Sequence, residues 1–446
     1  MTNPTPASPA PVAKTGFAAY LQPRVLVMLV LGFSSGLPFL MVGNTFGYWL
    51  REEGTSLTAI GLISGVGLAY SLKFLWAPII DRVRAPLFGR LGRRRGWMAL
   101  SQILIALGLV AMATVGLTYG NTILGLCALV VAFASATQDI VIDAWRIENA
   151  TSEGEQGLLT SAASFGYRVA LLATDALILI VADRIGWRGA YILYGALMAI
   201  GLIATFCATE SISANAALIG KKALWTLRGL GDAIAGPFIA FFKTHGWLAL
   251  LMLSAIALYR LPDFFMGPMC NPYYHDLGLT KTLVGEVRAS IGLIASFLGI
   301  AAGGFAALKL GNMRALVIGG ILQGFSIASF SLMAYWGPSL PLFTAIMTAD
   351  GFAISFAGVV LVSYMSSLTS LGYTATQYAL LASAYTVAGK SLKTLSGLMV
   401  DTLKTSHGLM DAYGIFFLCA GLIGLPAIFL FMLLSHKLHH RTIQNT

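Results

Sequence analysis

Twelve apolar stretches of about twenty residues each recur along this chain, and they restrict its fold more than any other feature. Hydrophobic residues make up 57% of the 446 residues and charged residues only 10%, against about 25% charged residues in soluble domains. Such a chain cannot cover itself with polar surface, so we expect lipid to surround it. Each stretch is predicted to be a helix, because backbone in hydrocarbon must satisfy its hydrogen bonds internally. The predicted spans are 24–50, 57–80, 97–118, 121–146, 157–182, 188–208, 247–272, 283–308, 313–336, 339–368, 373–400 and 411–435.

A short loop between the second and third spans carries six arginines, in the sequence DRVRAPLFGRLGRRRG at 81–96. Positively charged loops stay in the cytoplasm, so this loop fixes the orientation of the spans that follow it. With both termini placed inside, most lysines and arginines fall in the inner segments. Topology therefore explains the net charge of +10, and no nucleic-acid partner is expected.

The predicted spans fall into two sets of six, separated by a segment in which basic and apolar residues alternate at helical spacing. Short similarities connect the two sets, such as GTSLTAIG at 54–61 and GLTKTLVG at 278–285. Two parallel repeats with a substrate site between them are therefore expected. The predicted division is a disordered tail at 1–20, a six-helix bundle at 21–208, a cytoplasmic amphipathic linker at 209–245, a second six-helix bundle at 246–436 and a cytoplasmic tail at 437–446.

Several ionisable residues fall inside the predicted spans, where a charge costs about 2.5–3.5 kcal/mol and therefore suggests function. Carboxylates there are candidates for carrying protons. We rank Asp350 and Asp263 slightly above Asp139, because Asp139 has cations nearby that are candidate partners. The proton-coupling candidates are Asp139, Asp143, Asp175, Asp263 and Asp350. The substrate-cavity candidates are Asn44, Tyr48, Lys73, Gln138, Tyr167, Arg168, Tyr259, Arg260, Tyr385 and Lys390.

The arginine loop and the inner end of the fourth span are candidates for a gate that opens and closes the inner side. Asp143 and Arg146 follow Asp139 at one face of a helix and could join this network. Lys73, Asp139 and Arg168 have an alternative interpretation, in which paired charges only hold neighbouring helices together or lock the inner face. The gate candidates are Asp81, Arg82, Arg93, Arg94, Arg95 and Arg146.

No catalytic or metal-binding pattern emerges from the sequence. The segment AGKS at 388–391 imitates the end of a phosphate loop, but Ala384 stands where the first glycine is required and the segment lies within a predicted helix. The histidines lack the companions of a metal site or a catalytic triad. The chain is therefore expected to be no enzyme and to bind no metal or cofactor.

Four sequence segments resemble one branch of the major facilitator transporters, the AmpG-type muropeptide permeases. They are GFSSGLPFLMVGNTFGYWLREEG at 32–54, YSLKFLWAPIIDR at 70–82 with LGRRRGW at 91–97, ATQDIVIDAWRIE at 136–148, and GPFIAFF at 236–242 with ALYRLPDFF at 257–265. The resemblance extends through most of the chain. It implies an all-α membrane protein with twelve transmembrane helices in two six-helix bundles, the major facilitator fold.

The resemblance also implies a function. Members of this branch import disaccharides of N-acetylglucosamine and anhydro-N-acetylmuramic acid, with or without a stem peptide, together with protons. This import serves peptidoglycan recycling and β-lactamase induction, and thereby antibiotic resistance. The implied setting is the bacterial inner membrane, with a monomeric chain surrounded by lipid and both termini in the cytoplasm. Two alternatives stay open: transport of another anionic solute such as acetyl-CoA, and a membrane sensor that transports nothing.

Overall fold

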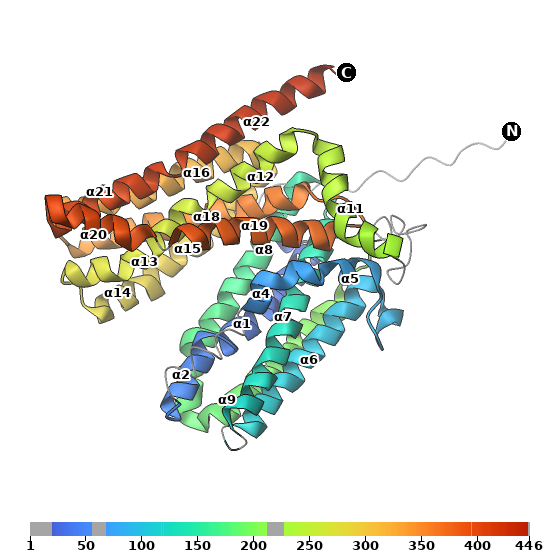
Figure 1. The fold of residues 1–446 in the computed structure, drawn as a ribbon. Coiled ribbons are helices and arrows are strands. Elements are labelled where there is room, and N and C mark those ends of the chain that lie inside the picture. The colour runs from blue at the N-terminus through green and yellow to red at the C-terminus, as the bar shows by residue number, and fades with distance from the viewer. Residues whose placement is uncertain are drawn as a thin grey trace.

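The computed structural model describes residues 20–55, 68–116, 118, 120–211, 227–393 and 395–444, and this part of the chain contains helices and no strand. The helices of the first half gather on one side of Figure 1. Their bounds are α1 Pro23–Met41, α2 Asn44–Glu52, α4 Leu68–Leu72, η3 Lys73–Leu75, α5 Ala77–Arg82, η4 Gly89–Leu91, α6 Arg93–Val115, α7 Asn121–Asn149, α8 Glu153–Leu172, η5 Ala173–Leu177 and α9 Ile178–Cys207.

The helices of the second half form another bundle, and α11 lies where this bundle meets the first half (Figure 1). The bounds of these elements are α11 Leu227–His245, α12 Leu248–Tyr259, α13 Leu261–Asp276, α14 Lys281–Val287, η6 Arg288–Gly292, α15 Leu293–Leu310, α16 Asn312–Ser329, α17 Ser331–Trp336, α18 Leu340–Ser367, α19 Thr374–Lys393, α20 Leu395–His407, α21 Leu409–Leu422 and α22 Leu425–Gln444. The helix α22 extends into the predicted tail at 437–446.

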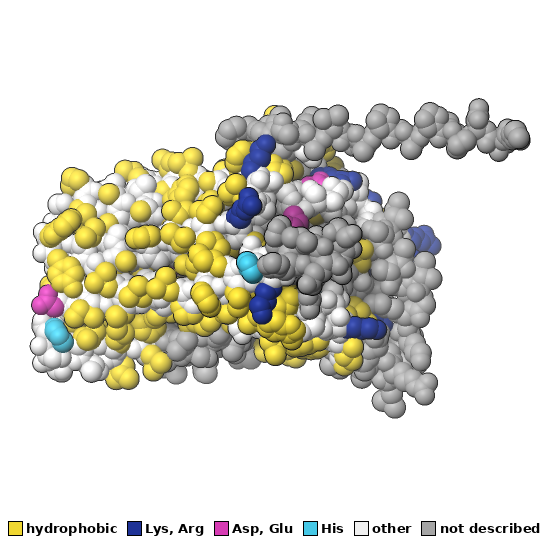
Figure 2. Space-filling view, turned by 90° about the horizontal axis from the view of Figure 1, so that it is seen from above, with side chains coloured by type: hydrophobic (Ala, Val, Ile, Leu, Met, Phe, Trp, Pro, Cys, Tyr) yellow, Lys and Arg dark blue, Asp and Glu magenta, His cyan; other side chains and the backbone are white. Residues whose placement is uncertain are grey.

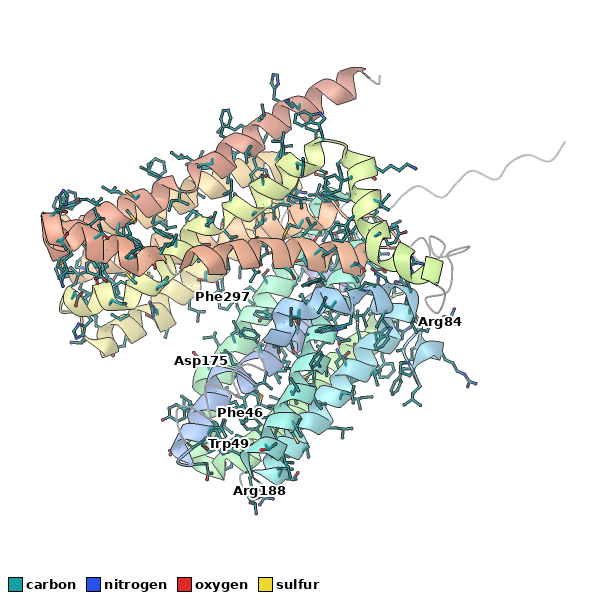
Figure 3. All side chains as sticks on the ribbon, in the orientation of Figure 1. Phe46, Trp49, Arg84, Asp175, Arg188 and Phe297 are labelled. Carbon is teal, nitrogen blue, oxygen red and sulfur yellow. The ribbon has the colours of Figure 1, made fainter. Side chains whose placement is uncertain are left out.

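Each half has apolar cores of its own, and the halves meet at only one end of the molecule in Figure 1. At that end, Ala375 and Ala379 of α19 pack into a core of the first half. We call it the basic end, because Arg84 of the arginine loop lies there (Figure 3). Toward α2, α9, α14 and α20 the halves spread apart, and we call this the open end.

Nine helices within the described residues are long and apolar enough to cross a membrane, and they coincide with nine of the twelve predicted spans. The predicted span at 57–80 falls partly on 56–67, which lie outside the described residues. The predicted spans at 157–182 and 373–400 correspond to α8 with η5, and to α19 with α20. For these three segments, spanning stays a prediction.

Two helix boundaries differ from the sequence prediction in ways that shape the basic end. The helix α6 begins at Arg93, so three of the loop arginines lie in its first turn instead of in the loop. The helix α7 continues to Asn149 and carries Glu148 in its last turn. Gly186, with φ at 73°, interrupts the helical path inside α9, so the residues before it continue α8 and η5 while those after it form the next helix.

The surface between the two ends is largely apolar. Figure 2 shows hydrophobic side chains over most of one face, with lysine and arginine side chains toward the end where the halves meet. Phe325, Phe429 and Leu250 are 75%, 65% and 61% exposed. Soluble monomers rarely leave so much contiguous apolar surface uncovered, so lipid is the environment that this face fits.

Candidate functional site

A cavity of about 390 Å³ lies between the two halves, within the volume range of ligand pockets. Helices α1, α7 and α8 line it from the first half, and α15, α18 and α19 line it from the second. Gly32 on α1 and Gly166 on α8 lack side chains, which lets these helices pack backbone to backbone beside the cavity. The charged side chains in the lining are Asp139, Asp143, Arg146, Arg168 and Arg260.

The helix α7 supplies the acidic side of the cavity. Asp143 accepts a hydrogen bond of 2.9 Å from Arg146 Nη2, and Lys73 Nζ lies 3.9 Å from Asp143 Oδ2. Asp139, one turn earlier, accepts a hydrogen bond from the hydroxyl of Ser35. Asp143 therefore has two cations beside it, whereas the hydrogen bond that Asp139 accepts comes from a neutral hydroxyl.

Arg146 forms the part of the cavity wall that lies closest to the basic end. Its Nη1 donates a 2.5 Å hydrogen bond to Thr160 Oγ1 on α8. Its guanidinium lies 5.3 Å from the ring centroid of Tyr378, which belongs to α19 of the other half. Arg146 therefore connects α7 and α8 with the second half. It lies closer to the basic end than Asp139 and Asp143 do, because it follows them along α7.

The second half presents Arg260 to the cavity at the junction of α12 and α13. Arg260 Nη1 lies 3.0 Å from Asp263 Oδ2 and donates to the carbonyl of Ile354 at 3.2 Å. Arg168 on α8 lines the same cavity from the first half. Tyr167 and Tyr385 add aromatic lining, one from each half.

The two halves contact each other through aromatic and glycine positions beside the cavity. Phe165 on α8 and Phe297 on α15 have ring centroids 4.4 Å apart, and Phe297 lies between the halves in Figure 3. Nearer the basic end, Ser161 donates to the carbonyl of Ile300 at 2.8 Å. A side chain at Gly304 would collide with Ser161, so glycine permits this close approach.

A buried cluster of four charges closes the basic end: Asp81, Arg93, Arg94 and Glu148. Arg94 Nη2 lies 2.8 Å from Asp81 Oδ1, and Arg94 Nε donates to Glu148 Oε2 at 3.0 Å. Arg93 Nη2 donates to Glu148 Oε1 at 3.2 Å. Two guanidinium groups thus face two carboxylates, and the cluster has no net charge.

Asp81 extends this cluster across to the second half. Its carboxylate accepts backbone hydrogen bonds from Ala375 and Thr376, at 3.1 and 2.9 Å, and a third bond of 2.7 Å from the Thr376 hydroxyl. These donors lie in the first turn of α19, where backbone N–H groups have no helical acceptor and favour an anion. Arg82 also crosses the boundary, 5.4 Å from the ring centroid of Tyr373.

The structure distributes the predicted gate residues over three places. Asp81, Arg82, Arg93 and Arg94 lie in or beside the buried cluster, and Arg146 lies in the cavity wall. Arg95 instead binds the end of α9, donating from Nη2 to the carbonyl of Phe206 at 2.9 Å and from Nε to that of Thr205 at 3.2 Å.

The predicted substrate and proton residues are likewise divided. Asp139, Asp143, Tyr167, Arg168, Arg260 and Tyr385 line the cavity, and Lys73 approaches Asp143. The side chains of Asn44 and Lys390 fall outside the described part of the structure. Among the described residues, the remaining candidates lie outside the cavity lining. Gln138 donates a hydrogen bond to Ser34, and Tyr259 donates one to the carbonyl of Leu316. Asp263 forms an ion pair with Arg260, and Asp350 accepts a hydrogen bond from Ser326. Tyr48 is exposed beside Trp187, and Asp175 is exposed in η5.

Sequence reasoning missed several residues of these two sites. Glu148 and Thr376 complete the buried cluster, while Ser35 and Tyr378 contact the cavity charges. The only available signal was Glu148 itself, an acidic residue two positions beyond the inner end of the predicted span 121–146, on the same side of the membrane as the six loop arginines. The remaining three are common residue types whose position depends on packing between distant helices.

The chain is similar to known transporters over nearly its full length. The profile of the Major Facilitator Superfamily matches residues 25–391. The anhydromuropeptide permease of Escherichia coli K12 is 33% identical over 432 residues, which cover 96% of this chain and 82% of the permease. A Rickettsia felis protein named as the transporter AmpG 4 is 30% identical over 419 residues, which cover 93% of this chain and 97% of that protein.

Solved structures give the same fold. The proton:xylose symporter XylE bound to 6-bromo-6-deoxy-D-glucose matches with a TM-score of 0.66 at 15% identity, covering 93% of this chain and 96% of the symporter. A bacterial homologue of the iron transporter ferroportin in an outward-facing state matches with a TM-score of 0.63 at 14% identity, covering 93% of this chain and 98% of that homologue. At these identities the likeness shows the fold alone.

These matches confirm the family that the sequence motifs indicated. The profile covers most of the chain, and the relatives at 30% and 33% identity extend over almost all of it. The protein is accordingly a multi-pass membrane transporter of small molecules and no enzyme. The chain belongs to the Major Facilitator Superfamily, in the group of the AmpG-type anhydromuropeptide permeases.

Proposed function

We propose that this protein imports anhydromuropeptides, the disaccharide of N-acetylglucosamine and anhydro-N-acetylmuramic acid with or without its peptide, together with protons. The observation that carries the proposal is the charged cavity between the two halves, in a chain 33% identical to an anhydromuropeptide permease. Tyr167 and Tyr385 supply rings for sugar faces, and Arg168 and Arg260 supply cations for an acidic ligand. The import would feed peptidoglycan recycling and β-lactamase induction.

The proposal includes a membrane topology. Twelve spans form two bundles, at 21–208 and 246–436, and the segment 209–245 connects them on the cytoplasmic side. The basic end faces the cytoplasm because positively charged loops stay inside, and both termini lie there too. The chain resides in a bacterial inner membrane. In this orientation the open end faces outward, which is the side from which an importer takes its ligand.

We expect transport to require that contacts form at the open end while the contacts at the basic end break, so that the cavity opens to the other side of the membrane. In the present conformation the bonds from Asp81 to Ala375 and Thr376 hold the halves together at the basic end. Ligand bound in the cavity draws the open ends together, and the basic end must then separate. Each charge-assisted bond is worth about 1.5–3 kcal/mol, so the bonds from Asp81 to α19 contribute to the free energy that separation of the basic end has to overcome.

Asp139 is our first candidate for proton coupling. It lines the cavity, and the group that donates a hydrogen bond to its carboxylate is the neutral hydroxyl of Ser35. Asp143 ranks second because Arg146 and Lys73 lie beside it. Asp263 and Asp350 now rank lower, since neither lines the cavity. One proton that enters with one ligand carboxylate moves no net charge, so the pH gradient drives accumulation, and each pH unit supplies about 1.4 kcal/mol, enough for about ten-fold accumulation.

Uptake into proteoliposomes tests both parts of the proposal. Labelled disaccharide should accumulate when the outside is acidic, and acetyl-CoA under the same gradient should not. Asp139→Asn should leave exchange of the disaccharide across the membrane intact while abolishing accumulation. Accumulation of acetyl-CoA alone would replace the proposed substrate with the alternative one. Full accumulation by Asp139→Asn and Asp143→Asn variants would remove both residues from the coupling role.

A further inference from the structure

The charges that line the cavity are not equally compensated. Asp143 has Arg146 and Lys73 beside it, and Arg260 has Asp263 at 3.0 Å. For Arg168, the described part of the structure contains no hydrogen-bond or ion-pair partner. A guanidinium withdrawn from bulk water without a counter-ion is unfavourable. Its position on the cavity wall leaves it available to a ligand.

Arg168 and Arg260 belong to opposite halves of the transporter. Arg168 lies on α8, and Arg260 lies between α12 and α13, yet both line one cavity. Two guanidinium groups that approach each other repel, and the repulsion grows as the halves come closer. An anion placed between them attracts both guanidinium groups, because guanidinium groups bind carboxylates through paired hydrogen bonds, and this attraction offsets their mutual repulsion.

We propose that Arg168 and Arg260 form an anion clamp, in which a carboxylate of the ligand bridges the two halves and thereby favours closure of the open end. This inference rests on the proposed function and adds to it the group by which the substrate is recognised. In the disaccharide that group is the lactyl carboxylate of the muramic acid. Without ligand, repulsion across the cavity keeps the open end apart, so the clamp opposes closure of the empty transporter.

The ligand arm of the test compares the disaccharide with its carboxamide, which has the same shape without the charge. In proteoliposomes the wild type should bind the acid about 10- to 100-fold more tightly than the amide, as expected for charge-assisted hydrogen bonds. Arg168→Gln should abolish this preference and keep the affinity for the amide. Arg168→Lys should restore part of the preference. Arg314→Gln, which removes an exposed arginine of α16, serves as the control.

The conformational arm needs no ligand. Spin labels at Asp183→Cys and His407→Cys, both exposed and on opposite halves, report the separation of the open ends in a background without the native cysteines. Arg168→Gln should shift the distance distribution of the empty protein toward shorter values, whereas Arg314→Gln should leave it unchanged.

The outcomes separate the clamp from the proposed function. Retained preference for the acid in Arg168→Gln, equal loss of acid and amide binding, or an unchanged distance distribution would each overturn the clamp. If the wild type binds neither form of the disaccharide, the proposed substrate fails, and the spin-label distances alone then decide whether the two arginines control closure.

Discussion

The buried cluster at the basic end and the cavity between the halves contain the same kinds of charge, but they compensate them differently. In the cluster, Asp81 and Glu148 face Arg93 and Arg94, and protein groups satisfy the carboxylates on several sides. In the cavity, Arg168 has no described partner. Charges that the protein satisfies hold one conformation together, whereas a charge that it leaves open is available to a ligand.

The position of each region explains this contrast. The cluster lies where helices of both halves are in contact, so the bonds from Asp81 to the first turn of α19 exclude water and fix geometry. The cavity lies beyond that contact, toward the side where the halves spread apart (Figure 1). A substitution in the cluster should therefore change folding and conformation, and one in the cavity should change ligand or proton dependence.

The largest effect is expected from Arg94→Gln. It removes a cation that contacts both Asp81 and Glu148, and breaking a buried ion pair costs about 3–5 kcal/mol. The thermal unfolding temperature should fall, and exchange of labelled disaccharide should slow at least about ten-fold. The adjacent Arg95→Gln is the matched control, because Arg95 binds carbonyls at the end of α9 within its own half. Equal losses in the two variants would show that the buried cluster matters no more than the contact of Arg95 with α9.

A smaller effect is expected from Gly304→Ala, which introduces a methyl group where α15 meets α8. The new Cβ would lie 3.0 Å from the Tyr20 hydroxyl and closer still to Ser161. Overpacking costs about 1–3 kcal/mol, so the basic end should open at least about five-fold more often. Alkylation of a reporter cysteine at the buried Ala375 measures this opening.

Gly299→Ala is the control for this substitution. Its methyl group would meet the backbone of Phe352, which belongs to the same half. The unfolding temperature should fall, but alkylation at the reporter should stay at the level of the parent protein. Unchanged alkylation in Gly304→Ala would show that the contact between α8 and α15 does not help to close the basic end.

The smallest effect is expected from Ser35→Ala, which removes the hydroxyl that donates to Asp139. A hydrogen bond of this kind contributes about 0.5–1.5 kcal/mol, so pH-driven accumulation should fall about three-fold as the carboxylate loses its fixed orientation. The adjacent Ser34→Ala removes a bond from Gln138 instead. It should lower stability and leave accumulation unchanged. Similar accumulation in both variants would argue against Asp139 as the coupling group.

The sequence by itself determined the class of protein and most of its spans. Runs of apolar residues require helices in lipid, a local rule that needs no knowledge of packing. Nine predicted spans accordingly have counterparts among the described helices. The motifs around the arginine loop also indicated the family, which the comparisons then confirmed. The start of α6 differs from the prediction: the helix takes up Arg93–Arg95, where carboxylates pair with Arg93 and Arg94, and Glu210 accepts a hydrogen bond from the backbone N–H of Arg95.

Only the tertiary structure decided which charges share a site. Asp81 and Thr376 are 295 positions apart, and Ser35 and Asp139 are 104 apart, so no spacing rule could have paired them. Arg94 and Arg95 are equivalent in sequence, but successive residues of a helix point in different directions, so one enters the buried cluster and the other reaches α9. Local composition sets which segments enter the membrane, whereas the contacts between helices set what each charge does there.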